Sequence, residues 1–185
     1  DATQKSSEVL NKYAEKFSGK TNLYLMLVPT QIEFDQSPYK DLSDSEKEMI
    51  DFVYSSLSDI QPVNVYDKLK RHTGEYIYFR TDHHWTQRGG YYGYQSLMEA
   101  KGERPVPLED MELKSYDGFL GYLYNQANVE EYSKHADTIE YFENGENYVV
   151  DIKGIEDGKR ENKESVQRNK VIKPKPSKQY GKAQL

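Results

Sequence analysis

The residue types best suited to acid–base chemistry gather in one short run, residues 81–86, which holds one carboxylate, two imidazoles and the single tryptophan of the chain. In an extended backbone, alternate side chains point to the same side. We therefore expect Asp82 and His84 on one side of the run, and His83 and Trp85 on the other. A carboxylate that orients an imidazole makes a general base, so Asp82 and His84 are the predicted catalytic residues.

A structural interpretation of the same pair stays open. The carboxylate of Asp82 could cap the helix that follows, and His84 could be hydrogen-bonded inside the core. Spacing alone does not separate these roles from catalysis.

Four neighbouring residues are candidate substrate contacts. His83 and Trp85 are expected either to pack within the fold, which is the commoner role, or to form a platform on which a sugar ring stacks. Arg80 is expected either to pair with an acidic neighbour or to bind an anionic group. Tyr78, on the segment that leads into the run, completes the set.

Metal chemistry is the competing interpretation of the run. Aspartate and histidine are ligands suited to zinc or iron. However, adjacent side chains diverge in an extended chain, no HExxH spacing occurs, and His72 and His135 are isolated in the sequence. We therefore predict no metal ion, and nothing in the sequence indicates a cofactor.

Charge divides the chain into an acidic body and a basic end. Residues 159–185 carry nine Lys/Arg against two Asp/Glu, while the residues before them carry 16 against 29. An acidic body argues against binding to the phosphate backbone of a nucleic acid. We expect the basic end to be a solvated, disordered tail; contact with an anionic membrane or polymer is the alternative.

Absent residue types and segments exclude several classes. The chain has no cysteine, which excludes thiol catalysis, disulfides and thiolate metal sites. No apolar run of about 18 residues occurs, so we expect no membrane span. No signal peptide is evident. Because the chain begins at Asp1, we expect it to be a processed or trimmed product.

Helical and strand patterns alternate through residue 101. Apolar spacing predicts helices over residues 4–17 and 87–101, and a capping box at residues 43–46 opens another. A further short helix is expected at residues 65–69. Apolar runs predict strands at residues 23–28, 62–65 and 76–79, and later at 111–116, 138–142 and 148–152. This order is typical of an α/β fold, whose ligands bind at the carboxyl ends of parallel strands.

Several segments together resemble one family. The main one is residues 76–86, followed by the Gly- and Tyr-rich residues 89–94; residues 24–30 and 117–127 contribute further similarity. These segments resemble the DHHW protein family, which is named for the four residues that stand here at 82–85. The family is similar to the alginate O-acetyltransferase proteins of the SGNH-hydrolase-like superfamily. The similarity extends over roughly residues 1–152.

The resemblance implies an α/β, SGNH-hydrolase-like three-layer fold with a mainly parallel sheet, here incomplete at the C-terminus. It implies a bacterial, extracytoplasmic O-acetyltransferase or acetylesterase that is secreted, at the cell surface or periplasm-like. Its partners would be a cell-surface polysaccharide, an acetyl donor and a membrane-bound acyltransferase. Asp82 and His84 match the Asp-x-His pair of the family by position.

The nucleophile departs from the family pattern. In the alginate-type relatives a serine follows the Asp-x-His pair, in a Gly-Asp-Ser or Lys-Asp-Ser turn, and no such tripeptide occurs after His84. None of the later serines follows a buried strand into a tight turn. We expect that the chain is truncated before its nucleophile or has diverged at its end, which leaves its own activity open.

The expected organisation is an SGNH-like domain of the DHHW type at residues 1–153, with a basic, disordered or diverged tail at residues 154–185. The alternative function is a non-catalytic module that binds carbohydrate, or acts as a scaffold, in an exopolysaccharide assembly system. Such a module would use the tyrosines and Trp85 as its contact surface.

Overall fold

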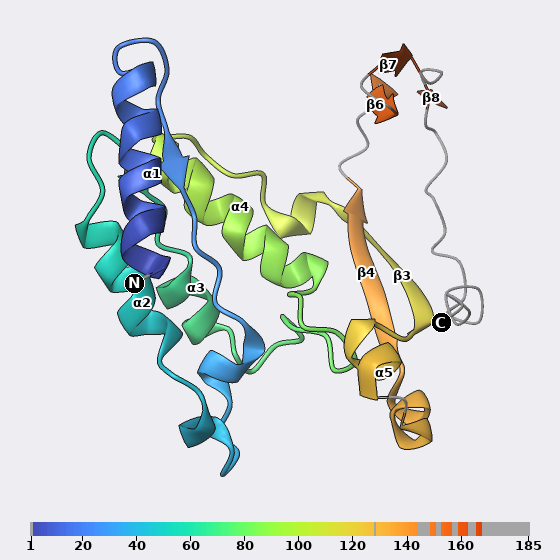
Figure 1. Ribbon diagram of the computed structural model, residues 1–185. Coiled ribbons are helices and arrows are strands. Elements are labelled where there is room, and N and C mark those ends of the chain that lie inside the picture. Colours follow the sequence, from blue (N-terminus) through green and yellow to red (C-terminus); the bar gives the residue numbers. More distant parts are fainter. Residues whose placement is uncertain are drawn as a thin grey trace.

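The computed structural model describes residues 2–127 and 129–143. Beyond them it describes the backbone of four short strands: β5 (Val149–Val150), β6 (Lys153–Glu156), β7 (Lys159–Asn162) and β8 (Val166–Gln167). The first three helices gather at one side of the molecule, α4 (Gln87–Lys101) runs through its middle, and the pair of β3 (Glu112–Phe119) and β4 (Asp137–Glu143) stands at the other side, with α5 (Tyr122–Ala127) beside it (Figure 1). In the described part, no helix is both long and apolar enough to cross a bilayer.

The predicted helices are present, with small shifts at their ends. Their bounds are α1 (Ala2–Phe17), α2 (Glu46–Ser55), α3 (Tyr66–Arg71) and α4 (Gln87–Lys101). The capping box predicted at residues 43–46 is wrong, because the N-cap of α2 is Ser45 and not Ser43. The side chain of Ser45 accepts a hydrogen bond from the amide of Glu48. Short helices occupy several of the connections: η1 (Gln31–Phe34), η2 (Lys40–Leu42), η3 (Leu108–Asp110), α5 (Tyr122–Ala127) and η4 (Glu130–His135).

The helix α4 is the central element. Thr86 caps its N-terminus by accepting from the amide of Gly89 at 3.3 Å, and Gly102 ends it with a left-handed φ of 73°. The helix packs on α3 and also contacts β4. Because residue 86 ends the histidine-bearing run, the cap ties that run directly to a helix that contributes Tyr91 and Tyr92 to the core.

The parallel pairing is short. The strands β1 (Tyr24–Leu25) and β2 (Gln61–Pro62) pair in parallel over two residues each, within the segments predicted at 23–28 and 62–65. The hydroxyl of Tyr54 accepts from the amide of Leu27 at 2.9 Å and donates to the carbonyl of Val63 at 2.9 Å. It thus takes the place of the next ladder bonds, and the pairing ends there.

The prediction of a strand at residues 76–79 is wrong. Tyr78 pairs with Trp85 in an isolated antiparallel bridge, and the amide of Phe79 donates to the carbonyl of His84 at 3.2 Å. The chain therefore doubles back between these residues instead of continuing as a strand. The histidine-bearing run forms the tip of a tight loop.

The longest pairing is antiparallel. The strands β3 (Glu112–Phe119) and β4 (Asp137–Glu143) include the predicted residues 111–116 and 138–142 almost entirely. Their register shifts at Gly118, whose φ of 87° suits a bulge. Mixed helices and sheets confirm the α/β class, although in the described part the parallel pairing amounts to β1 and β2 alone.

The core lies between α3, α4 and the strand-like segment at residues 77–78. Its buried members are Val65, Leu69, Ile77, Tyr78, Tyr91 and Tyr92. Partly buried Met26 and Trp85 pack against this cluster. The loop at residues 78–85 thus leaves the core at Tyr78 and returns to it at Trp85.

The predicted boundary between residues 153 and 154 stays a prediction. Of residues 154–185, the structure describes backbone at 154–156, 159–162 and 166–167, and the rest of the predicted tail lies outside the described residues. The strand predicted at 148–152 is described as β5 only at residues 149–150, where it pairs with β8.

Candidate active site

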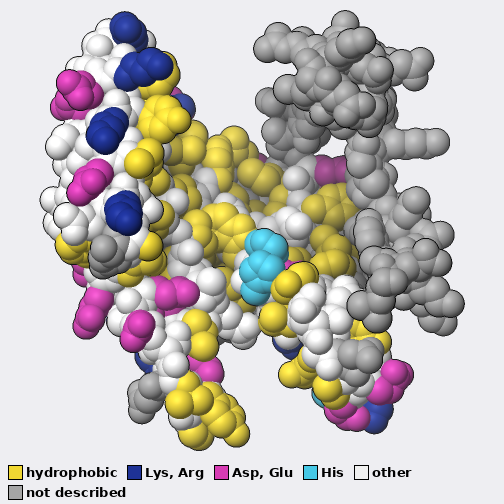
Figure 2. Space-filling view, in the orientation of Figure 1, with side chains coloured by type: hydrophobic (Ala, Val, Ile, Leu, Met, Phe, Trp, Pro, Cys, Tyr) yellow, Lys and Arg dark blue, Asp and Glu magenta, His cyan; other side chains and the backbone are white. Residues whose placement is uncertain are grey.

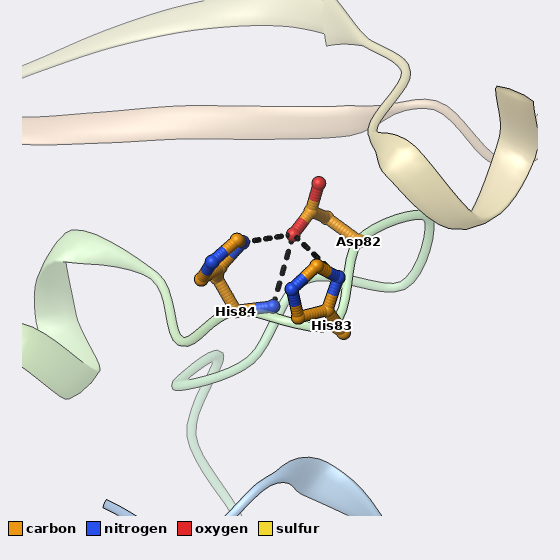
Figure 3. Close-up of side chains that lie close together, drawn as sticks. All are labelled: Asp82, His83 and His84. Atoms are coloured by element: carbon orange, nitrogen blue, oxygen red, sulfur yellow. Dashed lines mark hydrogen bonds and ion pairs between the residues drawn. The ribbon is translucent and has the colours of Figure 1, made fainter.

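Asp82 and His84 form a direct pair at the tip of the loop. The Oδ1 atom of Asp82 lies 2.6 Å from Nδ1 of the His84 ring and also accepts from the backbone amide of His84 at 2.9 Å. Figure 3 shows both interactions converging on the same carboxylate oxygen. One oxygen therefore fixes the backbone and the imidazole of the same residue.

The second oxygen of Asp82 is held from a distant segment. Oδ2 accepts from the amide of Tyr122, at the start of α5, at 2.8 Å. The chain approaches so closely that a Cβ atom on Gly121 would lie 2.4 Å from Cβ of Asp82 and 2.8 Å from the carbonyl oxygen of Thr81. Only glycine fits at position 121 without a shift of the backbone.

These contacts set the charge state of Asp82. Burial alone disfavours the carboxylate, but two backbone amides and the His84 ring bind its charged form more strongly, so the pKa of Asp82 lies below its ordinary value. Asp82 is 7% exposed. It is therefore a fixed, ionised partner for the imidazole at neutral pH.

The His84 ring is open to solvent on its other side. Its side chain is 67% exposed, and no described residue is hydrogen-bonded to its Nε2 atom. With Nδ1 occupied by Asp82, Nε2 is the atom that can take and return a proton. Histidine side chains stand exposed near the centre of the face in Figure 2, flanked by hydrophobic side chains.

The two structural interpretations of the pair are wrong. Thr86, not Asp82, caps α4. His84 is exposed rather than bonded inside the core. The pair therefore fills neither of the two structural roles that the sequence left open.

His83 does not point away from the pair, so the expectation from an extended backbone is wrong here. Its Nδ1 atom lies 3.8 Å from Oδ1 of Asp82, and its ring centroid lies 3.9 Å from that of His84. The tight turn at the loop tip gathers consecutive side chains that a strand would separate. The ring of His83 also meets that of Tyr122 edge-on, at 5.4 Å between centroids.

Arg80 is paired with an acidic residue. Its Nε atom lies 3.4 Å from Oδ1 of Asp137, and its Nη2 atom donates to the carbonyl of Ala136 at 3.1 Å. The guanidinium also lies over the ring of Tyr76. Because 56% of the Arg80 side chain is exposed, contact with a substrate stays a prediction.

Tyr78 and Trp85 are placed in the packing of the domain, away from His84. Tyr78 is buried and donates its hydroxyl to the carbonyl of Pro29 at 2.7 Å. The Trp85 ring lies against Gly93, where an added Cβ would be 2.6 Å from its Cη2 atom. The structure does not bring these two residues to the site, and their contact with substrate stays a prediction.

The cluster of Asp82, His83 and His84 contains the donor types of a metal site, with one ligand atom from each within 4.8 Å of the others. The distance between Asp82 and His84 suits a shared proton better than a shared metal ion. Two ligands bound tetrahedrally at about 2.0–2.1 Å from zinc stand roughly 3.3 Å apart, whereas Asp82 Oδ1 and His84 Nδ1 are 2.6 Å apart. The pair as it stands shares a hydrogen bond.

The described residues place no serine hydroxyl in a hydrogen bond with His84. Ser96 donates to the carbonyl of Tyr92 within α4, Ser133 donates to Glu130, and Ser115 lies on β3 opposite Glu140. The other two serines that follow His84 in the sequence, Ser165 and Ser177, lie outside the described residues. Within the described residues, the pair therefore stands without a serine partner.

Sequence reasoning missed the residues that hold the pair in place. Gly121 and Tyr122 lie about 40 positions away from Asp82 in the sequence, and no local periodicity connects them. The one available signal was the Asp-Gly-Phe-Leu-Gly segment at residues 117–121, which resembles the same family as the histidine run.

The fold and site together define an α/β domain that carries an aspartate–histidine pair on a loop. The chain belongs to the DHHW protein family, whose profile matches residues 2–170. The predicted resemblance is thereby confirmed. No curated protein matches the chain.

Solved structures share the fold. A DHHW family protein from Eubacterium siraeum is 30% identical, with a TM-score of 0.71, over 76% of this chain and 47% of that one. Bacillus cereus PatB1 is 18% identical, with a TM-score of 0.67, over 87% and 58%. The O-acetyltransferase domain of Pseudomonas putida AlgJ is 14% identical, with a TM-score of 0.50, over 75% and 54%. The chain thus spans about half of the length of these structures.

Proposed function

We propose that the chain carries the acid–base half of an O-acetyltransferase or acetylesterase that acts on a cell-surface polysaccharide outside the cytoplasm. The observation that carries the proposal is the 2.6 Å contact between Asp82 Oδ1 and His84 Nδ1 on a ring that is otherwise exposed. Fold similarity to the O-acetyltransferase domain of AlgJ supports acetyl transfer as the reaction.

In the proposed reaction, Nε2 of His84 takes the proton of a serine hydroxyl as its oxygen attacks the carbonyl of an acetyl ester. The bond from the acetyl carbon to the donor oxygen breaks, and the donor leaves with the proton from His84. The acetyl group then rests on the serine. A sugar hydroxyl, or water, attacks next and gives its proton to His84, which returns a proton to the serine.

Asp82 has two tasks in this cycle. Its carboxylate accepts the Nδ1 proton, which fixes the tautomer that leaves the Nε2 lone pair free. It also stabilises the imidazolium that forms while His84 holds the extra proton. We propose that the serine lies outside the described residues. We also propose that a membrane-bound acyltransferase supplies the acetyl group.

The rival function, a non-catalytic carbohydrate-binding module, would use the tyrosines and Trp85 as its contact surface, and Trp85 is not available for that role. That ring packs against Gly93 and the core instead. Exposed aromatic rings do lie at the site, with His83 beside His84 and Tyr122 beside His83, where they suit the rim of an acceptor site. The contacts of the pair therefore favour the catalytic proposal.

Release of p-nitrophenol from its acetate ester tests the proposal. The variants are His84→Ala, Asp82→Asn and, as a matched control, His135→Ala, which removes an exposed imidazole from η4. We expect His84→Ala to lower the rate by about 10²-fold or more, and His135→Ala to leave it within about twofold. Nonspecific hydrolysis of the ester by exposed imidazoles would affect both variants alike, so it cannot produce this difference. Equal rates in the wild type and His84→Ala would contradict the proposal.

Covalent labelling locates the nucleophile. A sulfonyl fluoride reacts with a serine that a neighbouring base activates, and mass spectrometry of the digested protein identifies the labelled residue. We expect one serine to be labelled in the wild type and not in His84→Ala. A wild-type chain that neither hydrolyses the ester nor takes up the label has no acyl-transfer activity of its own.

A further inference from the structure

A fully buried carboxylate lies next to the site without being part of the pair. Asp137 is the first residue of β4 and is 0% exposed. Its Oδ1 atom accepts from the amide of Arg80 at 2.9 Å, and its Oδ2 atom accepts from the amide and the hydroxyl of Thr81 at 2.7 and 2.5 Å. The hydroxyl of Tyr76 donates to Oδ1 as well. All four donors come from the segment that runs into Asp82.

Burying an ionised carboxylate is costly unless charge-assisted hydrogen bonds compensate it. The donors around Asp137 do so, and the Arg80 side chain adds an opposite charge at 3.4 Å. Two of the donors are consecutive backbone amides, at positions 80 and 81, which the turn of the loop leaves without ladder partners. The carboxylate on β4 therefore fixes the backbone directly before Asp82.

The hydroxyl of Thr81 passes this restraint to a second segment. Because a carboxylate cannot donate, Thr81 Oγ1 must give its proton to Asp137, which leaves its lone pairs for the amide of Gly121 at 2.9 Å. The carbonyl of Thr81 also accepts from the amide of Tyr124 at 3.2 Å. Position 81 is thus bonded to the loop before α5 and to α5 itself.

The second segment in turn holds the catalytic carboxylate. Gly121 is followed by Tyr122, whose amide binds Oδ2 of Asp82 at 2.8 Å. Oδ2 is the oxygen that does not face His84. With Oδ2 fixed by that amide, Oδ1 is aimed at the imidazole.

We infer that Asp137 is a positioning residue of the site: through Thr81 it sets the loop at residues 121–122, and so aims the carboxylate of Asp82 at His84. The inference rests on the proposed function only in treating the Asp82–His84 pair as catalytic. Asparagine cannot replace Asp137, because its amide nitrogen would meet donors where Oδ1 or Oδ2 now accepts.

The amide proton of Tyr122 reports the contact directly by NMR. Its chemical shift follows the charge of Asp82 as the carboxyl titrates, with the His83 and His84 rings as the other titratable groups facing that carboxylate. In the wild type we expect the chemical shift of this amide proton to change across the acid pH range. We expect this change to be lost in Asp137→Asn, as it is in Asp82→Asn. Val53→Ala, which truncates a buried side chain in α2, is the matched destabilised control and retains the shift.

The hydroxyl of Thr81 gives a second, milder test if Asp137→Asn does not fold. Thr81→Val keeps the shape of the side chain and removes the hydroxyl, while Thr81→Ser keeps the hydroxyl. We expect the titration shift of the Tyr122 amide to be lost in the first variant and rescued in the second. If the Tyr122 amide titrates in Thr81→Val, or in a folded Asp137→Asn, as it does in the wild type, the inference is overturned.

The NMR readout does not require catalysis. If the protein proves inactive on acetyl esters while the Tyr122 amide behaves as expected, the proposed function fails and the positioning role of Asp137 stands. If activity depends on His84 but the amide shift survives in Thr81→Val or in a folded Asp137→Asn, the positioning role fails alone.

Discussion

Two buried carboxylates hold the same loop and are satisfied in different ways. Asp137, on β4, is bonded entirely to a folded segment: two backbone amides, two hydroxyls and a guanidinium. Asp82, at the loop tip, is hydrogen-bonded to two backbone amides and to an imidazole whose side chain is 67% exposed. The difference separates an anchor, whose amide and hydroxyl donors all lie on one folded segment, from a carboxylate that keeps an exposed imidazole as a partner.

Removal of the anchor should have the largest effect on stability. In Asp137→Ala, two amides and two hydroxyls lose their acceptor in a buried place, so we expect the free energy of unfolding to fall by about 3–5 kcal/mol. Asp82→Ala should cost less, because His84 and its neighbours can turn to water. Urea denaturation of both variants checks the order; an equal or larger loss in Asp82→Ala would contradict the division of roles.

Gly121→Ala should have the next largest effect on stability, because it crowds the site. In Gly121→Ala the new methyl group meets Asp82 and the carbonyl of Thr81, and the backbone must shift, so we expect a loss of about 1–3 kcal/mol in the free energy of unfolding. Gly74 has open space where a Cβ would stand, which makes Gly74→Ala the matched control. Similar thermal stabilities for the two variants would show that the loop before α5 can move away from Asp82 at little cost.

The pH dependence of stability should distinguish Asp82 from an ordinary surface carboxylate. Burial opposes its charge, but its hydrogen bonds outweigh burial and lower its pKa in the folded state. A lowered pKa stabilises the fold above the unfolded value of about 3.9 and loses that contribution as the pH falls through the folded value. We expect wild-type stability to decline more steeply below about pH 4 than that of Asp82→Asn, in denaturation measured across the acid range.

The smallest change in stability should come from the residue most important to the proposed reaction. The His84 side chain is 67% exposed, so we expect His84→Ala to alter the free energy of unfolding by less than about 0.5 kcal/mol. Circular dichroism during denaturation measures this. A loss comparable to that of Asp137→Ala would identify His84 as a structural residue and remove its catalytic interpretation.

The pairing of Asp82 with His84 could be predicted from the sequence, although the geometric reason was wrong. Alternation along a strand places these two side chains together, but it also separates His83 from them. The structure has a turn instead, in which one carboxylate oxygen binds the amide and the ring of the residue two positions on. The spacing of two residues satisfies both geometries, so it could not distinguish them.

The supports of the pair could not be predicted from the sequence. Thr81 contacts Asp137 and Gly121, which are 56 and 40 residues away in the chain. No periodicity or local propensity connects such positions, because tertiary packing alone brings them together. The helices, by contrast, follow from apolar spacing and caps, as Thr86 and Gly102 show for α4.

The short parallel pair has a similar explanation. The apolar run at residues 23–28 predicts a buried strand, but a tyrosine hydroxyl from α2 takes the amide of Leu27 after two paired residues. A side chain that replaces a ladder partner leaves no trace in the pattern of the strand. Strand length is therefore the part of the fold that the sequence determined least.

The tautomer of the His84 ring tests the central claim most directly. Nitrogen-15 NMR of the imidazole, above the pH at which the ring is protonated, distinguishes which nitrogen carries the hydrogen. We expect the proton on Nδ1, bound to Asp82, with Nε2 unprotonated, and a mixture of both forms in Asp82→Asn. A wild-type ring with its proton on Nε2 would contradict the account, because it would have no base to offer a nucleophile.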